Sequence, residues 1–124
     1  MKHFAIAIIS AAIISTSAIA GEIDFSAQIK NIDGTIIRTC ELDTPACKTP
    51  TTLAAVASAA LLADDPKQPT TGTDKVKRYV LAVKVYPGGK ISLPVEDITL
   101  IKERIATIFP PLIVGRSYDI LDPK

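Results

Sequence analysis

The chain has 124 residues, with 14 basic and 13 acidic side chains, a formal net charge of +1 and 48% hydrophobic residues. This length accommodates one small domain. The composition is too apolar and too weakly charged for a chain that is disordered throughout. It is also too neutral for a typical nucleic-acid-binding protein, so we expect no nucleic-acid partner.

The N-terminus has the three parts of an export signal in the right order. Lys2 supplies a positive charge, and an apolar stretch follows from Phe4 to Ile14. Ala18-Ile19-Ala20 then has the small-x-small form that a signal peptidase accepts. The sequence therefore predicts cleavage between Ala20 and Gly21. The alternative is an uncleaved membrane anchor, but the stretch from Phe4 to Ala20 is just short of the roughly 20 residues that a spanning helix needs, and it carries serines and a threonine.

This interpretation predicts a signal peptide at residues 1–20 and a single domain at residues 21–124. We expect a periplasmic or secreted protein with no stable membrane insertion after cleavage. Cleavage would remove Lys2, so that equal numbers of basic and acidic side chains are left. It would also remove His3, the only histidine of the chain.

Cys40 and Cys47 lie on either side of Asp43-Thr44-Pro45, a sequence that favours a turn. In an oxidising compartment such a pair most simply forms a local disulfide, worth roughly 2.5 kcal/mol for so short a loop. A redox pair is an alternative, although catalytic pairs usually have the closer C-x-x-C spacing. Metal binding and free thiols are further alternatives, but two thiols without a histidine make only half of a zinc site.

Apolar and polar residues alternate strictly from Ile23 to Lys30, which is typical of a half-buried strand. Asp33-Gly34 follows, a dipeptide favoured in a two-residue type I′ turn. Residues 35–39 are rich in β-branched side chains, which favour a second strand. This pattern predicts a β-hairpin.

The first predicted helix runs from Leu53 to Ala63. It is rich in alanine, the best helix former, and the threonines before it are suitable N-caps. Residues 64–74 consist almost entirely of turn-forming residues and are predicted to form an exposed loop.

The segment from Lys75 to Tyr86 is ambiguous. Its valines and aromatic residues favour a strand by propensity. Its apolar residues nevertheless recur at helical spacing, and Asp74 is a possible cap, so we favour a helix and keep the strand as the alternative. Pro87-Gly88-Gly89 ends the element in either case. The residues at helical spacing are Val76, Tyr79, Val80, Val83 and Tyr86.

Two further helices are predicted. The first begins at Pro94-Val95-Glu96-Asp97, where proline and acidic residues suit a first turn, and Pro110-Pro111 ends it. The second covers Leu112 to Leu121, with Gly115 either weakening it or marking a close packing contact. In the first of them we expect Ile98, Ile101, Ile105 and Ile108 on the buried face, and Lys102, Glu103 and Arg104 facing away.

Together these elements predict an α+β fold, in which an N-terminal β-hairpin precedes a small bundle of three to four short helices. The hairpin and the disulfide loop would occupy about residues 22–48 of the domain. The helical part would occupy about residues 51–122.

The residue types exclude several kinds of catalysis. Without a histidine after cleavage, Ser-His-Asp and Cys-His nucleophile systems and the usual zinc-enzyme ligand sets are impossible. Gly88-Gly89-Lys90 lacks the other residues of a phosphate-binding loop. The acid pairs Asp64-Asp65 and Glu96-Asp97 stand at predicted helix ends, where stabilising those ends is their simplest role. We therefore expect no enzyme activity, no cofactor and no metal site, although a Ser-Lys dyad stays formally open.

Two other groups of side chains have simple structural interpretations. Lys75, Lys77 and Arg78 form the one basic cluster, which we expect to be a solvated helix face. We expect the three tyrosines to lie in the core with their hydroxyls at the surface, rather than to form a recognition surface. They are Tyr79, Tyr86 and Tyr118.

The order of short motifs resembles a group of small phage- and prophage-associated proteins of unknown function, closest to exported bacterial versions with a signal peptide and a cysteine pair. The resemblance implies a mobile-element origin and a helix at Lys75–Tyr86, and it transfers no catalytic residue. The motifs are Asp24-Phe25, Asp33-Gly34, Thr52-Leu53 with Leu61-Leu62, Lys77-Arg78, Glu96-Asp97-Ile98 with Leu100-Ile101-Lys102, and Pro111-Leu112-Ile113-Val114-Gly115.

The expected function is that of an exported, non-enzymatic protein that binds another macromolecule. An envelope inhibitor or an immunity-type factor with an unknown protein partner is the concrete form of this expectation. The alternative is a structural subunit of a phage-derived or envelope assembly. An enzyme with a Ser-Lys or carboxylate site is the third hypothesis.

Overall fold

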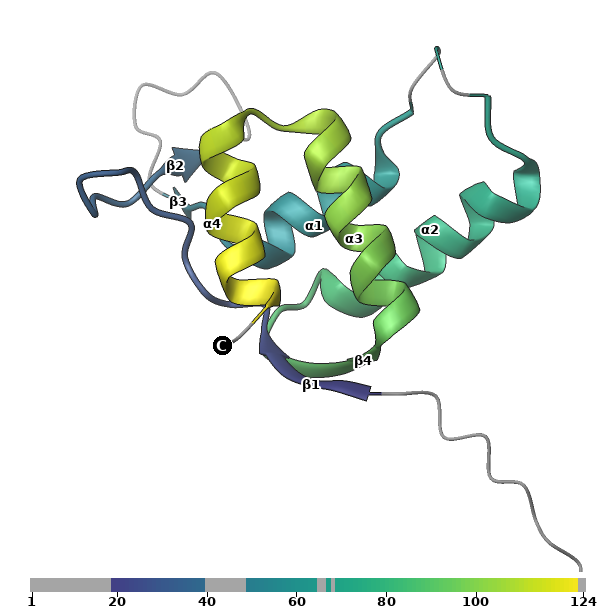
Figure 1. Cartoon of the computed structure of the whole chain (residues 1–124), viewed down its shortest axis with the longest axis horizontal. Helices are drawn as coiled ribbons and strands as arrows, with labels where there is room; N and C mark the ends of the chain where they lie inside the picture. The colour runs from purple at the N-terminus through teal and green to yellow at the C-terminus, as the bar shows by residue number, and fades with distance from the viewer. Residues whose placement is uncertain (1–18, 40–48, 65–66, 68, 123–124) are drawn as a thin grey trace, which may run out of the picture.

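A computed structural model describes residues 19–39, 49–64, 67 and 69–122 of the chain. The fold is α+β, as the sequence predicts, with short strands and a small bundle of helices (Figure 1). The elements are β1 (Ile19–Asp24), β2 (Arg38–Thr39), β3 (Thr49–Pro50), α1 (Leu53–Leu62), α2 (Gly72–Val85), β4 (Lys90–Pro94), α3 (Val95–Ile108) and α4 (Pro111–Leu121).

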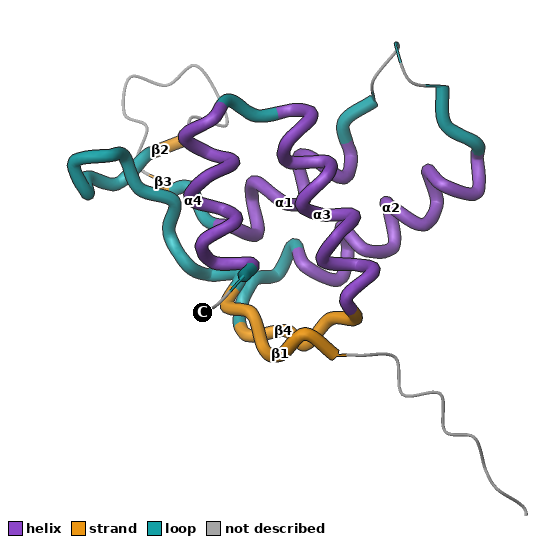
Figure 2. Tube along the Cα trace, in the orientation of Figure 1, coloured by secondary structure: helices purple, strands orange, loops and turns teal. Residues whose placement is uncertain are grey.

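The helices lie above a two-stranded sheet, with α2 and α4 on opposite flanks and α1 and α3 between them (Figures 1 and 2). The sheet joins β1 to β4 in antiparallel register, with Ile23 opposite Ile91. Helix α1 contacts each of the other three helices. The core therefore forms around α1.

Helix α1 is buried on most of its circumference because its residues are small. Thr52 caps it by accepting a hydrogen bond from the Ala55 amide (3.3 Å). This confirms the predicted helix and its threonine cap. Its buried side chains are Leu53, Ala54, Val56, Ala57, Ser58, Ala60 and Leu61.

The predicted strand Ile23–Lys30 is interrupted. Strand β1 ends at Asp24, whose carboxylate accepts a hydrogen bond from the Ser26 amide (3.0 Å) and turns the chain. Strand β1 pairs with β4 and not with residues 35–39. No strand was predicted at β4. The alternation was nevertheless informative, because Phe25 and Ile29 are fully buried.

The predicted turn joins a narrow hairpin. The Asn31 amide donates to the Thr35 carbonyl (2.8 Å), and Lys30 forms a bridge with Ile36. The turn is not type I′, because that type needs two positive φ angles and Asp33 does not have one. Instead, the Asp33 carboxylate accepts from the hydroxyl (2.7 Å) and the amide (3.0 Å) of Thr35. Both bonds lower the pKa of the Asp33 carboxyl, and the bond from the Thr35 hydroxyl has the larger effect.

Helix α2 confirms the helical interpretation of Lys75–Tyr86, and the alternative strand is wrong. The helix begins at Gly72, earlier than predicted, so part of the expected loop at residues 64–74 is helical. The cap is Thr71, whose hydroxyl accepts from the Asp74 amide (3.2 Å). The prediction of Asp74 as the cap is therefore wrong.

Helix α3 buries Ile98, Ile101 and Ile105 as predicted, while Ile108 at its end is partly exposed. The expectation that Arg104 faces away is wrong, because it is only 8% exposed. Its Nε and Nη2 atoms donate to the carbonyls of Ala60 (3.2 Å) and Ala63 (2.8 Å) at the end of α1. Helix ends leave carbonyls without helical partners, and a positive charge there is favourable.

Helix α4 is present as predicted and begins one residue earlier, at Pro111. Gly115 does not mark a packing contact, because a Cβ added there would meet nothing within 4 Å. Tyr118 is half-buried and donates its hydroxyl hydrogen to the Lys102 carbonyl (3.0 Å), as expected for a core tyrosine with a polar tip. Lys102 also forms an ion pair with Asp122.

We predict that Arg104→Ala lowers the free energy of unfolding by about 2–3 kcal/mol, because it removes buried, charge-assisted bonds to the end of α1. The matched control is Arg116→Ala. Arg116 also donates to two carbonyls, those of Lys30 (3.1 Å) and Asn31 (2.7 Å), but at a more exposed site. Its loss should cost less than about 1 kcal/mol. Urea unfolding checks both, and equal effects would contradict the proposed role of Arg104.

The glycines give a second prediction. Gly88 has φ +77°, and an added Cβ would lie 2.8 Å from the Ser26 Oγ, which accepts from the Gly89 amide (2.6 Å). Gly88→Ala should therefore destabilise the protein by about 1–3 kcal/mol. Gly115→Ala, in an open helix position, should stabilise it by about 0.5–1 kcal/mol. Thermal unfolding of both variants should show shifts of opposite sign; a shared sign would refute this account.

Candidate interaction surface

Helix α2 exposes apolar side chains along one whole face. They are between 56% and 70% exposed. The expectation that Tyr79 and Tyr86 lie in the core is therefore wrong. We call this set the α2 apolar face; it consists of Val76, Tyr79, Val80, Val83 and the C-cap residue Tyr86, which directly follows α2.

A different side of α2 packs against α1. Its buried residues are Arg78, Leu81, Ala82 and Val85. Arg78 is only 6% exposed, so the prediction that it belongs to a solvated basic face is wrong, whereas Lys75 and Lys77 are exposed as predicted. The Nη1 atom of Arg78 donates to the Ala63 carbonyl (3.0 Å), and Nη2 donates to the Thr70 hydroxyl (3.3 Å). These bonds orient α2 about its axis and turn the apolar face outward.

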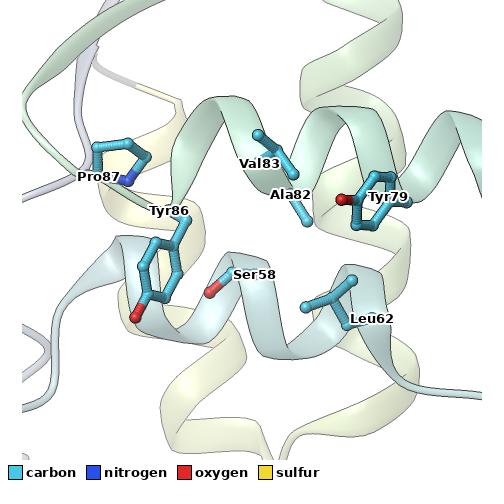
Figure 3. Close-up of a pocket in the computed structure, with 7 residues that line it drawn as sticks. All are labelled: Ser58, Leu62, Tyr79, Ala82, Val83, Tyr86 and Pro87. Carbon is cyan, nitrogen blue, oxygen red and sulfur yellow. The ribbon is translucent and has the colours of Figure 1, made fainter.

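The α2 apolar face continues into a hollow of about 300 Å³ between α1 and α2 (Figure 3). In this view Tyr79 and Tyr86 stand at its two ends, and Leu62 rises toward α2 from α1. The Ser58 hydroxyl donates to the Ala54 carbonyl (2.7 Å), so this polar atom is already satisfied within α1. The lining residues are Ser58, Leu62, Tyr79, Ala82, Val83, Tyr86 and Pro87.

Lysines border this apolar surface. Lys77 and Lys84 are exposed and line a second hollow on the far side of Val80, together with Asp97 of α3. On the other border, Lys75 forms an exposed ion pair with Asp64 (3.4 Å). The surface is thus apolar and aromatic along its middle, with a net basic border at Lys77 and Lys84 and an ion pair on the other border.

The acidic residues and serines considered as catalytic candidates lie at helix ends, in a turn or in the core. Glu96 and Asp97 lie in the first turn of α3, as predicted, and Asp64 follows α1. Ser26 accepts a backbone hydrogen bond, and Ser117 is buried in α4. Within the described residues, no three His, Cys, Asp or Glu side chains gather closely enough to hold a metal ion.

The predicted export and disulfide residues are only partly described. Ala20 and Gly21 lie in β1, where the register shifts between Ile19 and Glu22. Cys40 and Cys47 lie outside the described residues, as do residues 1–18. In the part of the chain that the structure describes, no helix is both long and apolar enough to cross a membrane.

The residues of the α2 apolar face were recognised from their helical spacing, but its two tyrosines were expected in the core, and Leu62 was not recognised as part of the surface. One feature of the sequence could have indicated that this face is exposed. Helix α2 carries apolar residues on two sides, Val76 and Val83 on one and Leu81 and Val85 on the other. A helix at the edge of a small bundle needs only one such stripe to pack.

Comparisons of the chain with protein-family models, with curated proteins and with solved structures gave no match. The resemblance to phage- and prophage-associated proteins therefore stays a prediction based on the motifs.

Proposed function

We propose that this is an exported, non-enzymatic protein that binds a protein partner through the α2 apolar face. The supporting observation is the exposure of five neighbouring apolar side chains on one helix, two of them tyrosines. Large contiguous apolar patches on soluble domains mark interaction sites, and tyrosine is enriched at interfaces. An envelope inhibitor or immunity-type factor in the periplasm or outside the cell is the concrete form of this proposal.

A structural subunit of a phage-derived or envelope assembly is the second candidate. The same observation supports it, because an exposed apolar face can also join copies of one chain. The two candidates differ in the molecule that covers α2, which an experiment can identify.

The first test places a photo-crosslinking residue at Val83 in the exported protein. We expect an adduct of defined mass with one other protein, because Val83 lies in the middle of the apolar face. The matched control carries the same residue at Glu103, which is exposed on α3. Mass spectrometry identifies the adducts. Equal adducts from both positions, or none from Val83, would contradict the proposed function, and an adduct with a second copy would support the assembly subunit.

The second test is the intact mass of the exported product. We expect the mass of residues 21–124 less two hydrogens, because the signal is removed and Cys40 and Cys47 are joined. The cut between Ala20 and Gly21 would leave Ile23 paired with Ile91 and buried. A full-length product with reactive thiols would contradict export and the disulfide together.

A further inference from the structure

If the α2 apolar face binds a protein, its geometry points to the kind of segment that it receives. We propose that the partner contributes an amphipathic α-helix with acidic borders, which lies along α2 over the hollow between α1 and α2. This inference rests on the proposed function and names the chemistry of the partner.

The spacing of the exposed side chains favours a helix. Val76, Tyr79, Val83 and Tyr86 follow one another at steps of three, four and three residues. This is the spacing of the apolar seam between two paired helices. Because all four are more than half exposed, the seam of α2 has no helix against it in the described structure.

The hollow beside the seam supplies a second contact. At about 300 Å³ it has room for a large apolar side chain, and Leu62 forms its wall on the α1 side. Leu62 is itself 58% exposed and would be covered by such a side chain.

The charges favour an acidic partner. Lys77 and Lys84 are exposed on the border of α2 beside Val80, and Asp97 of α3 is the one acidic side chain that lines the hollow there. On the other border Lys75 is exposed and paired with Asp64. Acidic side chains bordering the partner's apolar seam would lie near these lysines, as in helix pairs selected by charge.

A second copy of this chain fits the same face less well. A symmetric contact would set the face against itself. In an antiparallel pair each border faces the same border of the other copy, so α2 helices crossing near Val80 would bring Lys77 toward Lys84. In a parallel pair the border with Lys77 and Lys84 would face the border with Lys75. Like charges in such positions are unfavourable, so the basic borders oppose self-pairing.

The test uses the full exported protein and two synthetic helical peptides. Both peptides carry leucines at the seam positions, but one has glutamates at its borders and the other has lysines. Fluorescence anisotropy should show that the glutamate peptide binds about tenfold more tightly, and that raising the salt from about 50 mM to about 500 mM reduces this preference.

Two variants separate the apolar and the charged contributions. Val83→Asp should abolish binding of both peptides, because it puts a charge in the middle of the seam. The double variant Lys77→Glu and Lys84→Glu should reverse the preference toward the lysine peptide. The matched control, Lys30→Glu with Lys90→Glu, makes the same charge change at exposed positions outside α2 and should leave the preference unchanged.

Several outcomes would overturn the inference. Equal binding of the two peptides would remove the charge argument. Concentration-dependent dimers without peptide binding would assign the face to a second copy, and recruitment to phosphatidylglycerol vesicles alone would assign it to lipid. If Val83 still crosslinks to one protein while neither peptide binds, the proposed function stands and this inference fails. If crosslinking fails as well, both fail.

Discussion

Arg78 and Arg104 meet at the carbonyl end of α1, and the arrangement of the helices depends on this contact. Both donate to the Ala63 carbonyl, at 3.0 Å from Arg78 and 2.8 Å from Arg104. Helix α1 has no basic residue in its own last turn, so these side chains bring the charge that its dipole favours. Because they come from α2 and α3, one cluster fixes three helices. It also orients α2 so that the α2 apolar face is exposed to solvent.

The helices could be predicted because local patterns determine them. The steps of three and four between Ile98, Ile101 and Ile105 were sufficient to find α3 and its buried side. The buried side of α2 could not be predicted in this way. Leu81 and Val85 form one apolar stripe and Val76 and Val83 form another, so periodicity did not decide between them. The burial of Leu81, Ala82 and Val85 and the bonds of Arg78 to the end of α1 determine it, and both depend on the position of α1.

The strands were less predictable because their partners lie far away in the sequence. The alternation after Ile23 found buried positions but not the end of β1, which depends on the Asp24 turn. Strand β4 is short and follows two glycines, so it has little local signal. Its pairing with β1 also involves the approach of Gly88 to Ser26, a contact that no local pattern reveals. The α2 apolar face could not be predicted for the same reason, because a face is known to be exposed only once the packing of the core is known.

The α2 apolar face is separate from the forces that stabilise the domain. The buried residues of α1, α3 and β1 form a continuous core that includes Leu81 and Val85 but none of the five exposed side chains. Folding therefore does not explain why these positions are apolar. Exposed valines and tyrosines promote aggregation, which makes them unfavourable on a surface that has no partner. In a small domain the simplest explanation is that another molecule covers them, and the lysines at their edges then restrict which molecules can do so.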